Sequence, residues 1–298
     1  MNKLILIGIL AFNVLSCQNK EKNNIRHTIK KNDTMNEQPI YTLRISTANP
    51  HEIYVNNMPL ERDYSSGSST VELHINNFIL KSGIQSIAIV LLPENGKVLV
   101  DKLGIDYFDV KIYKYPNGLL NMSPEDRILI KEFTLKEFGE SPLVSKEISF
   151  EAIVPYKVEG WSGSVDLSKE NLDNLISETV KTYNDFGNLL KEKDYKVFFD
   201  KTRNRDKETD IDLYLTSEQI DDNRIETINT FKKIVDVIPL EKYKMRFYGN
   251  GKIVALVRID KDFNGESALQ AVLKDESTQI FELLLHRPKP GAPLQVIR

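Results

Sequence analysis

The side chain with the most definite chemistry in this sequence of 298 residues is its only cysteine, Cys17. It directly follows Val14-Leu15-Ser16, at the end of an apolar run that begins at Leu4 after Lys3. A positive charge, a short apolar run and a small residue before a cleavage point are typical of a secretory signal. The run of about a dozen residues is too short for a membrane-spanning helix, which needs roughly twenty. An unpaired thiol is a liability on a secreted domain, so the position of Cys17 indicates a role in export.

This segment resembles the signal of bacterial lipoproteins, because Val14-Leu15-Ser16-Cys17 matches the lipobox, although Leu15 is less typical than a small residue there. The resemblance implies export, cleavage before Cys17, and diacylglycerol on its sulfur, with acyl chains such as palmitate holding the protein at a membrane. In that family an Asp after the cysteine commonly means retention at an inner membrane. Gln18 therefore favours the outer membrane, on its periplasmic face or on the cell surface. An ordinary signal peptide that ends near a cysteine is the alternative.

Charge and composition limit the class of protein. The formal net charge is −3 and the isoelectric point is near 5.9, whereas nucleic-acid-binding domains are normally basic, so no nucleic-acid partner is expected. Hydrophobic residues make up 41% of the chain, which is enough to bury the cores of one or two domains. The sequence contains neither a phosphate-binding glycine-rich loop nor an HExxH motif. We therefore expect no cofactor.

One loop has oxygen ligands at the spacing of a calcium site. The segment Asp260-Lys261-Asp262-Phe263-Asn264-Gly265 matches the first half of an EF-hand loop. Ala271 occupies the twelfth position, where a bidentate Glu is required, and Ser267 occupies the eighth. Asp, Asn and Gly are also the residues that a hairpin turn prefers. The sequence therefore predicts a turn, with weak calcium binding as the alternative, and no metal ligand is assigned.

The segment Gly160-Trp161-Ser162-Gly163-Ser164 superficially resembles a nucleophile elbow, but Ser164 stands where the motif needs its last glycine. No histidine has a convincing position as a partner, and none has a second His or a Cys at metal spacing. Trp161, the only tryptophan, is the one candidate ligand-binding residue, because an indole can stack on a ligand. The alternative is that Trp161 packs between two domains. No catalytic residue is assigned. The four histidines are His27, His51, His74 and His286.

Acidic residues are the remaining candidates for chemistry. Asp206, Glu208, Asp210 and Asp212 form an acidic series at alternate positions. The basic residues Lys201, Arg203, Arg205 and Lys207 stand before and among them, a mixture that is typical of a solvated loop. A general acid and base would have to share one pocket. In the second half of the chain, the carboxylates that would have to converge for such a pair are Glu178, Asp185, Asp194 and Glu282.

The elements that position these residues fall into four segments. Residues 1–16 are the predicted signal peptide, and residues 17–39, with the lipidated cysteine, form a polar, flexible tether without apolar periodicity. Residues 40–159 are predicted to form an antiparallel β-sandwich, because alternating apolar residues recur in seven or eight short stretches. Residues 160–298 are predicted to form an α+β domain of helices packed on an antiparallel sheet. The stretches predicted as sandwich strands include 41–45, 71–75, 84–92, 97–100, 110–113, 128–130 and 148–154.

Within the sandwich, the turns Val55-Asn56-Asn57 and Leu80-Lys81-Ser82-Gly83-Ile84-Gln85 resemble those of the jelly-roll modules attached to many glycoside-active enzymes. Asn57 stands where glycine is usual, and Gln85 where asparagine is usual. The resemblance covers about forty residues and implies a fold rather than sugar binding.

In the second domain, Ser168 is the expected N-cap of a helix that continues to about Lys193. A short helix at 195–199, a charged loop at 201–212 and a helix from Ser217 to Pro239 are expected next. Strands at 243–248, 253–259, 269–273 and 280–286 follow, and then an extended tail. This order resembles the NTF2-like cone fold in topology.

Three functions fit these features. The first is a membrane-anchored, non-catalytic module that binds a protein or glycan partner or takes part in envelope assembly. The second is an immunity-type lipoprotein that blocks an exported toxin, which would need a complementary acidic or aromatic patch. The third is a lipid-anchored, glycan-active enzyme. Because no catalytic signature is found, we favour the first.

Overall fold

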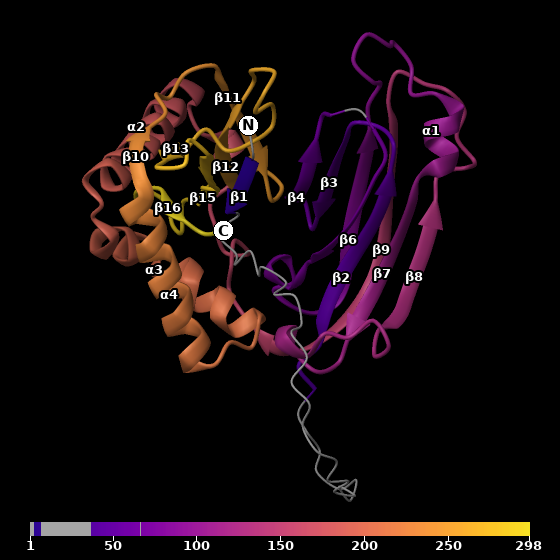
Figure 1. The fold of residues 1–298 in the computed structure, drawn as a ribbon, viewed down its shortest axis with the longest axis horizontal. Coiled ribbons are helices and arrows are strands. Elements are labelled where there is room, and N and C mark those ends of the chain that lie inside the picture. Colours follow the sequence, from indigo (N-terminus) through magenta and orange to yellow (C-terminus); the bar gives the residue numbers. More distant parts are fainter. Residues whose placement is uncertain (1–2, 7–36, 66) are drawn as a thin grey trace, which may run out of the picture.

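The computed structural model describes residues 3–6, 37–65 and 67–298 and is an α+β protein, as the sequence predicts (Figure 1). Cys17 and nearly all of the predicted signal and tether lie outside the described residues. Among the described helices, none is long and apolar enough to cross a membrane. The N-terminal half consists mainly of strands, and the C-terminal half consists of helices packed against sheets.

The N-terminal domain is a sandwich of two antiparallel sheets, with strand orders β5-β2-β7-β8 and β4-β3-β6-β9. A short helix, α1 (Lys102–Tyr107), precedes β7. The strands are β2 (Ile40–Thr47), β3 (His51–Val55), β4 (Met58–Asp63), β5 (Ser69–His74), β6 (Lys81–Leu91), β7 (Asp109–Tyr115), β8 (Ile128–Thr134) and β9 (Val144–Lys157).

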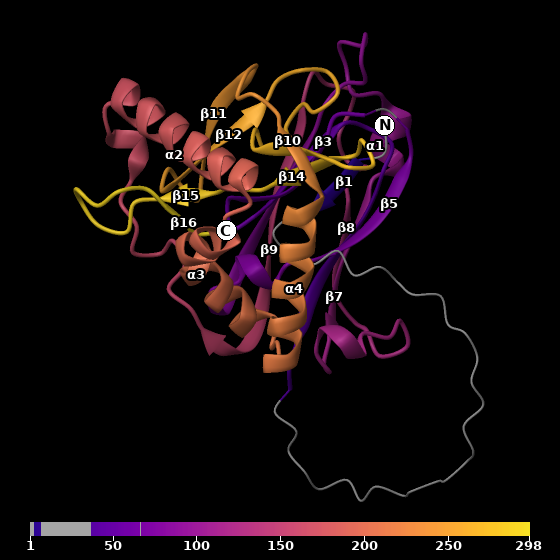
Figure 2. The same ribbon diagram turned by 60° about the vertical axis from the view of Figure 1, so that its left-hand side comes forward.

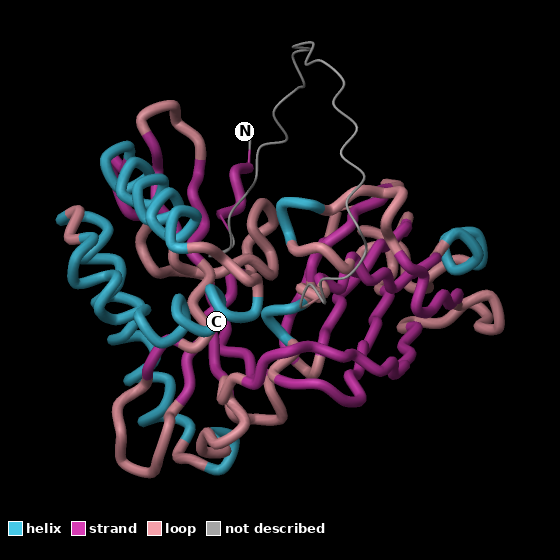
Figure 3. The backbone as a smooth tube through the Cα atoms, turned by 90° about the horizontal axis from the view of Figure 1, so that it is seen from below, coloured by secondary structure: helices cyan, strands magenta, loops and turns pink. Residues whose placement is uncertain are grey.

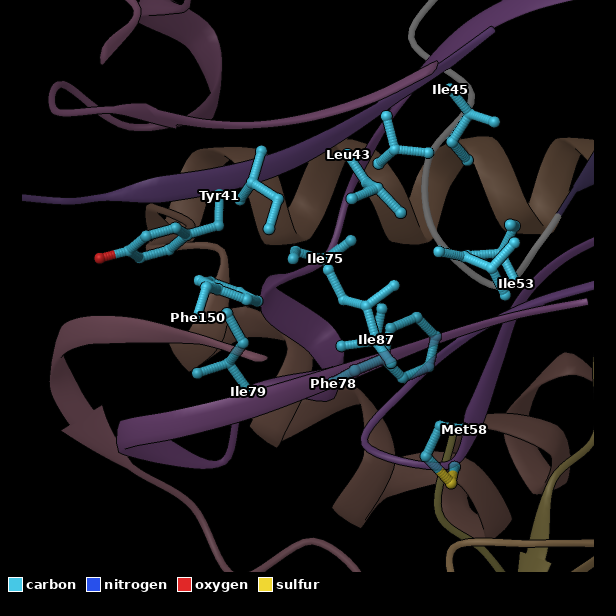
Figure 4. Close-up of a cluster of buried hydrophobic side chains, with 14 of the residues drawn as sticks. Tyr41, Leu43, Ile45, Ile53, Met58, Ile75, Phe78, Ile79, Ile87 and Phe150 are labelled. Carbon is cyan, nitrogen blue, oxygen red and sulfur yellow. The ribbon is translucent and has the colours of Figure 1, made fainter. Parts of the chain in front are cut away.

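Apolar side chains from both sheets meet in the middle of the sandwich (Figure 4). Leu43 and Ile45 of β2 face Ile53 of β3 and Ile87 of β6, and all four are fully buried. The residues between them are mostly only partly buried, so each strand has one fully buried apolar face, and burying these two faces against each other drives the packing of the sheets.

The two turns that resemble jelly-roll modules contact each other. Asn56 and Asn57 form the β3–β4 turn with φ angles of 51° and 61°, a left-handed conformation that Asn tolerates better than most residues. The Asn56 side chain donates to Gln85 Oε1 at 2.8 Å and accepts from the Ser86 backbone at 2.9 Å. These residues therefore hold the turn against β6. In contrast, the strand predicted at 97–100 is wrong: in this segment only Val100 makes an isolated bridge, to Ser141.

The C-terminal domain has three helices and two sheets, with strand orders β1-β14-β13-β10 and β11-β12-β15-β16. Figure 2 shows the helices grouped on the outer side of these strands. The helices are α2 (Leu172–Glu192), α3 (Tyr195–Asp212) and α4 (Ser217–Lys233). The strands are β1 (Lys3–Leu6), β10 (Ile234–Val237), β11 (Tyr243–Tyr248), β12 (Ile253–Arg258), β13 (Gln270–Leu273), β14 (Thr278–Phe281), β15 (Leu285–His286) and β16 (Gln295–Val296).

Helix α2 begins one turn later than predicted. Asn171, not Ser168, is its N-cap and accepts from the Asn174 backbone, because residues 167–169 form a separate 3₁₀ turn. The helix ends at Glu192, close to the predicted end, and Lys193 follows in a left-handed conformation. Tyr183 on its buried face donates to the Leu283 carbonyl, which fixes α2 against the sheet.

The largest correction concerns residues 201–212, which are helical and not a solvated loop. They continue α3, and Thr202, Arg205, Thr209 and Asp212 are buried on one face of it. The spacing of three and four residues is helical, but the side chains are polar, so no apolar period marks them. A polar buried face means that this helix packs against other polar groups.

Two further boundaries differ from the prediction. Helix α4 ends at Lys233, and Ile234–Val237 is a strand that pairs with β13. The strand predicted at 280–286 is broken, because β14 and β15 belong to different sheets. The tail is extended as predicted, and its β16 pairs antiparallel with β15.

The sandwich and the α+β domain share packing. Figures 1 and 3 show the sandwich strands on one side, with the C-terminal strands between them and the helices. The sandwich core cluster extends to Trp161, Tyr248 and Ile297 of the second domain. The Gly249 backbone also donates to the Asn57 carbonyl at 2.8 Å. The two domains therefore meet through both apolar and hydrogen-bonded contacts.

Candidate functional site at the domain junction

A cavity of about 340 Å³ lies where the end of the sandwich meets α3 and the C-terminal tail. Its size is at the lower end of small-molecule sites. The lining is mainly polar and comes from four parts of the chain. The lining residues include Lys157, Glu159, Gly160, Gly163, Ser164, Asn204, Lys207, Glu208, His286 and Gln295.

The most specific contact in this cavity joins Ser164 and His286, which are 122 positions apart in the sequence. The Ser164 hydroxyl lies 2.7 Å from Nδ1 of His286, and both residues are buried. His286 ends β15, and the Val165 backbone donates to the Arg287 carbonyl, which fixes the loop beside that strand. In the sequence, Ser164 only marks a departure from the nucleophile-elbow motif, so its contact with His286 is one that sequence reasoning missed.

The environment of His286 determines what the pair can do. Burial lowers the pKa of His286 to about 4, although Glu208 acts in the opposite direction. The imidazole is therefore neutral near pH 7 and a poor general base, whose pKa would ideally lie near the working pH. Among the described residues, no carboxylate hydrogen-bonds to the ring, so the third member of a catalytic triad is missing. The pair supplies a neutral donor and acceptor for a polar ligand.

Trp161, the residue predicted to bind a ligand, lies next to this cavity but is only 6% exposed. The Arg298 guanidinium lies 5.7 Å from the centre of its ring, which is a cation–π distance. This buried position agrees with the alternative prediction that Trp161 packs between the two domains. Trp161 also borders a second cavity of about 470 Å³, which the Asn56-Asn57 turn, Gln85 and Lys252 line as well.

Glu208, which lines the first cavity, also belongs to a group of charges that we call the Asp212 cluster: Asp212, Glu208 and Arg298. Glu208 accepts from the Gly160 backbone and from Arg298, both at 3.0 Å. Asp212 is fully buried, lies 3.7 Å from Arg298, and neither of its carboxylate oxygens has a hydrogen-bond partner. Burial raises the pKa of Asp212 well above its ordinary value, and Arg298 opposes this shift.

A second polar group spans the domains, and we call it the Glu52 cluster: Glu52, Tyr54, Tyr64 and Arg246. Arg246 of β11 donates to both oxygens of Glu52 on β3, at 2.8 and 2.9 Å. Tyr54 and Tyr64 also donate to Glu52. Burial alone would raise the pKa of Glu52, but these hydrogen bonds lower it to about 2. The carboxylate is therefore ionised and fully partnered at neutral pH.

The four carboxylates that an acid–base pair would require have separate partners. Glu178 pairs with Arg287, Asp185 with Lys181, and Glu282 with Arg62, while Asp194 caps α3. The Asp260 loop forms the predicted turn, and the Asp260 carboxylate accepts from Arg258 at 2.5 Å. Within the described ranges, no group of three or more His, Cys, Asp and Glu side chains is arranged to hold a metal ion.

A smaller cavity of about 120 Å³ lies between α3 and α4 and has a more apolar lining, with Phe198, Leu269 and Phe281. Arg205 and Asp206 form an ion pair at its edge. Burial raises the pKa of Asp210 there, and the neighbouring Asp206 adds to the shift. This cavity is small and lies within the C-terminal domain, between helices α3 and α4 and the strand β14.

Searches of protein-family models, curated proteins and solved structures gave no significant match to this chain.

Proposed function

We propose that this chain is an exported lipoprotein whose folded part is a non-catalytic binding or envelope-assembly module, with its ligand seat in the cavity beside Ser164 and His286. The observation that carries the proposal is this neutral Ser–His pair, which lines a polar cavity between two domains without a carboxylate to activate it. Such a pair recognises hydroxyl or amide groups by hydrogen bonding, and the ligand class that we favour is a glycan or an exposed peptide.

The contacts between the domains support a binding role. Glu52 and Arg246 connect the sandwich to β11, and Arg298 connects α3 to the Asn77 carbonyl of the sandwich. Charged groups that are already paired with each other cannot serve as acid or base without breaking the junction. A seat held between fixed elements is also preorganised, which reduces the ordering cost of binding.

The lipid anchor is the other half of the proposal. The lipid is attached at Cys17 and anchors the protein to the cell envelope, where Gln18 favours the outer membrane. Cleavage before Cys17 would also remove β1, which pairs in parallel with β14, and would leave the outer edge of β14 unpaired. Labelling of cells with radioactive palmitate should mark the wild-type protein and leave Cys17→Ser unmarked. Equal labelling of both would exclude the anchor at this residue.

A fluorophosphonate probe tests the non-catalytic part, because it reacts covalently with activated serines. The purified wild-type protein should label no faster than Ser164→Ala. Ser162→Ala is the matched control, since Ser162 is exposed on the same loop and its hydroxyl only donates to the Glu159 carbonyl. Labelling that disappears in Ser164→Ala and persists in Ser162→Ala would show an activated nucleophile and overturn the proposal.

Trp161 provides a direct readout of binding, because it is the only tryptophan and lies next to the cavity. Titration with oligosaccharides or short peptides from the cell envelope should change its fluorescence at saturable concentrations. Ser164→Ala should weaken the apparent affinity by about tenfold, the effect of losing about 1.4 kcal/mol, and Ser162→Ala should not. An unchanged affinity in Ser164→Ala would place the seat elsewhere.

A further inference from the structure

Four exposed apolar residues lie at one end of the sandwich, on or just before the edge strand β8, close to where the described chain resumes. Three consecutive residues of the edge strand β8 are exposed, together with a leucine in the preceding connection. Their exposed fractions are 58% for Leu120, 50% for Ile128, 49% for Leu129 and 38% for Ile130. We call these four residues the tether-end patch. Edge strands in soluble proteins are usually protected by charges or proline, so this composition needs a reason.

The position of Glu37 supplies that reason. The Gln38 backbone donates to the Pro116 carbonyl at 3.0 Å and accepts from Gly118 at 2.9 Å, so the chain resumes beside the end of β7. Lys114 of β7 forms an ion pair with Glu37 and is also the register partner of Ile128. The patch therefore lies one strand away from the point where the predicted tether joins the sandwich.

The length of the tether limits how far this end can be from a membrane. The 19 residues from 18 to 36 are predicted from the sequence to be a flexible tether, and a flexible chain of that length would have a root-mean-square span of about 25 Å. We infer that the tether-end patch is a membrane-facing surface, on which Leu120, Ile128, Leu129 and Ile130 insert into the interfacial region of the bilayer that holds the lipid anchor. This inference rests on the proposed lipid anchor at Cys17.

The charges around the patch indicate which kind of lipid surface it fits. Basic and acidic groups alternate and pair with each other, as in Lys114 with Glu37 and Arg127 with Glu72. Lys131 donates to the Ser149 carbonyl across the edge of the sandwich. A polybasic surface would attract anionic headgroups, but this mixed surface relies on apolar insertion. Contact therefore occurs on neutral phosphatidylcholine and does not require anionic lipid.

The opposite end of the sandwich offers a matched control. Helix α1 precedes β7 at the end where Asp109 pairs with Thr134, far from Lys114 along the strand (Figure 1). Val98 and Leu103 at that end are 80% and 82% exposed. Removing their apolar side chains changes a comparable exposed area at the end that faces away from the tether.

The test measures amide hydrogen exchange in the purified protein, as the cell processes it, anchored to phosphatidylcholine vesicles and free in solution. Anchoring uses the protein's own lipid or, where the Cys17 thiol is free, a maleimide-bearing phospholipid. Exchange in residues 119–132 should slow at least about threefold on the vesicles. Leu120→Ser with Leu129→Ser should abolish this protection, while Val98→Ser with Leu103→Ser should retain it, and circular dichroism should show both variants folded.

Several results would overturn the inference. Equal exchange in the anchored and free wild-type protein would do so without any variant. Protection that rises with protein concentration in solution would show that β8 pairs with another copy, and equal loss in the Val98/Leu103 variant would show that the effect is not local. Because the maleimide route supplies an anchor chemically, failure of palmitate labelling in cells would reject the native anchor and leave the test of the surface intact.

Discussion

The two polar clusters at the domain junction differ in how a carboxylate removed from water is partnered. In the Glu52 cluster, one carboxylate accepts two hydrogen bonds from Arg246 and one each from Tyr54 and Tyr64. In the Asp212 cluster, the more deeply buried carboxylate has no hydrogen-bond partner and only a distant cation, Arg298 at 3.7 Å. Burying a charge is costly unless it is paired and hydrogen-bonded. The Glu52 cluster therefore stabilises the contact between the domains, whereas no hydrogen bond offsets the free-energy cost of burying Asp212.

This difference matters because the uncompensated burial of Asp212 occurs in a cluster that reaches the proposed ligand-binding cavity. Glu208 belongs to the Asp212 cluster and also lines the cavity that contains Ser164 and His286. Groups whose polar requirements are not met by the protein are frequently found at functional sites. The difference between the clusters is thus consistent with a stable domain contact at the Glu52 cluster and a binding region beside the Asp212 cluster.

The largest effect is expected for Glu52→Ala, which leaves the partly buried guanidinium of Arg246 without its carboxylate partner. Loss of one member of such a pair should lower the free energy of unfolding by about 3 kcal/mol. Urea denaturation followed by circular dichroism measures this change. Glu132→Ala is the control, because Glu132 forms an exposed pair with Lys111 and should cost less than about 1 kcal/mol. Similar losses in the two variants would show that the Glu52 cluster is no stronger than a surface pair.

The opposite outcome is expected for Asp212→Asn. Because burial raises the pKa of Asp212, ionisation of its carboxyl destabilises the folded state at pH 7, and the neutral amide should stabilise it by about 1 kcal/mol. A group with a raised pKa regains stability as the pH falls through its folded pKa, so the advantage of Asn should shrink on acidification. Denaturation curves at pH 7 and pH 5 measure both effects. A loss above about 2 kcal/mol at pH 7 would show that the Arg298 interaction outweighs the cost of burial.

The two clusters also explain which parts of the fold the sequence could predict. The sandwich strands were predictable because apolar residues such as Leu43, Ile45 and Ile53 alternate with polar ones. Helix α3 was predicted only at its start, since Arg205 and Asp212 on its buried face are charged and carry no apolar period. The same polarity that hid the helix creates the Asp212 cluster.

The candidate site was predictable only in part. Trp161 is the only tryptophan and stands at the predicted domain boundary, where the sequence allows either ligand binding or packing between the domains. The contact between Ser164 and His286 spans 122 residues and depends on the loop at Val165 lying beside β15. Such a pairing follows from tertiary packing and leaves no local signal. The lipobox prediction at Cys17 and the NTF2-like resemblance both remain predictions.

The smallest expected effect is the pH dependence of stability that arises from a histidine outside both clusters. Burial lowers the pKa of His74 from 6.5 to about 4, and its Nδ1 is buried without a hydrogen-bond partner. The unfolded state therefore binds more protons between pH 6.5 and pH 4, and stability should fall as the pH falls through this window. At pH 6 the cost should be less than about 1 kcal/mol. His74→Gln should reduce this acid loss when unfolding midpoints are measured from pH 8 to pH 5.

His51 provides the control of opposite sign, since its side chain is also buried. Burial would lower its pKa, but the Glu61 carboxylate, 3.4 Å from Nε2 of His51, raises the pKa above 6.5. Its contribution is thus present below pH 6.5 and is lost as the pH rises through the folded pKa. His51→Gln should destabilise the protein more at pH 5.5 than at pH 8, the reverse of the pattern for His74→Gln. If both variants change the pH dependence of the unfolding midpoint in the same direction, the local partners of a buried histidine do not determine how its stability depends on pH. In that case, partners would not determine the cost of burying Glu52 and Asp212 either.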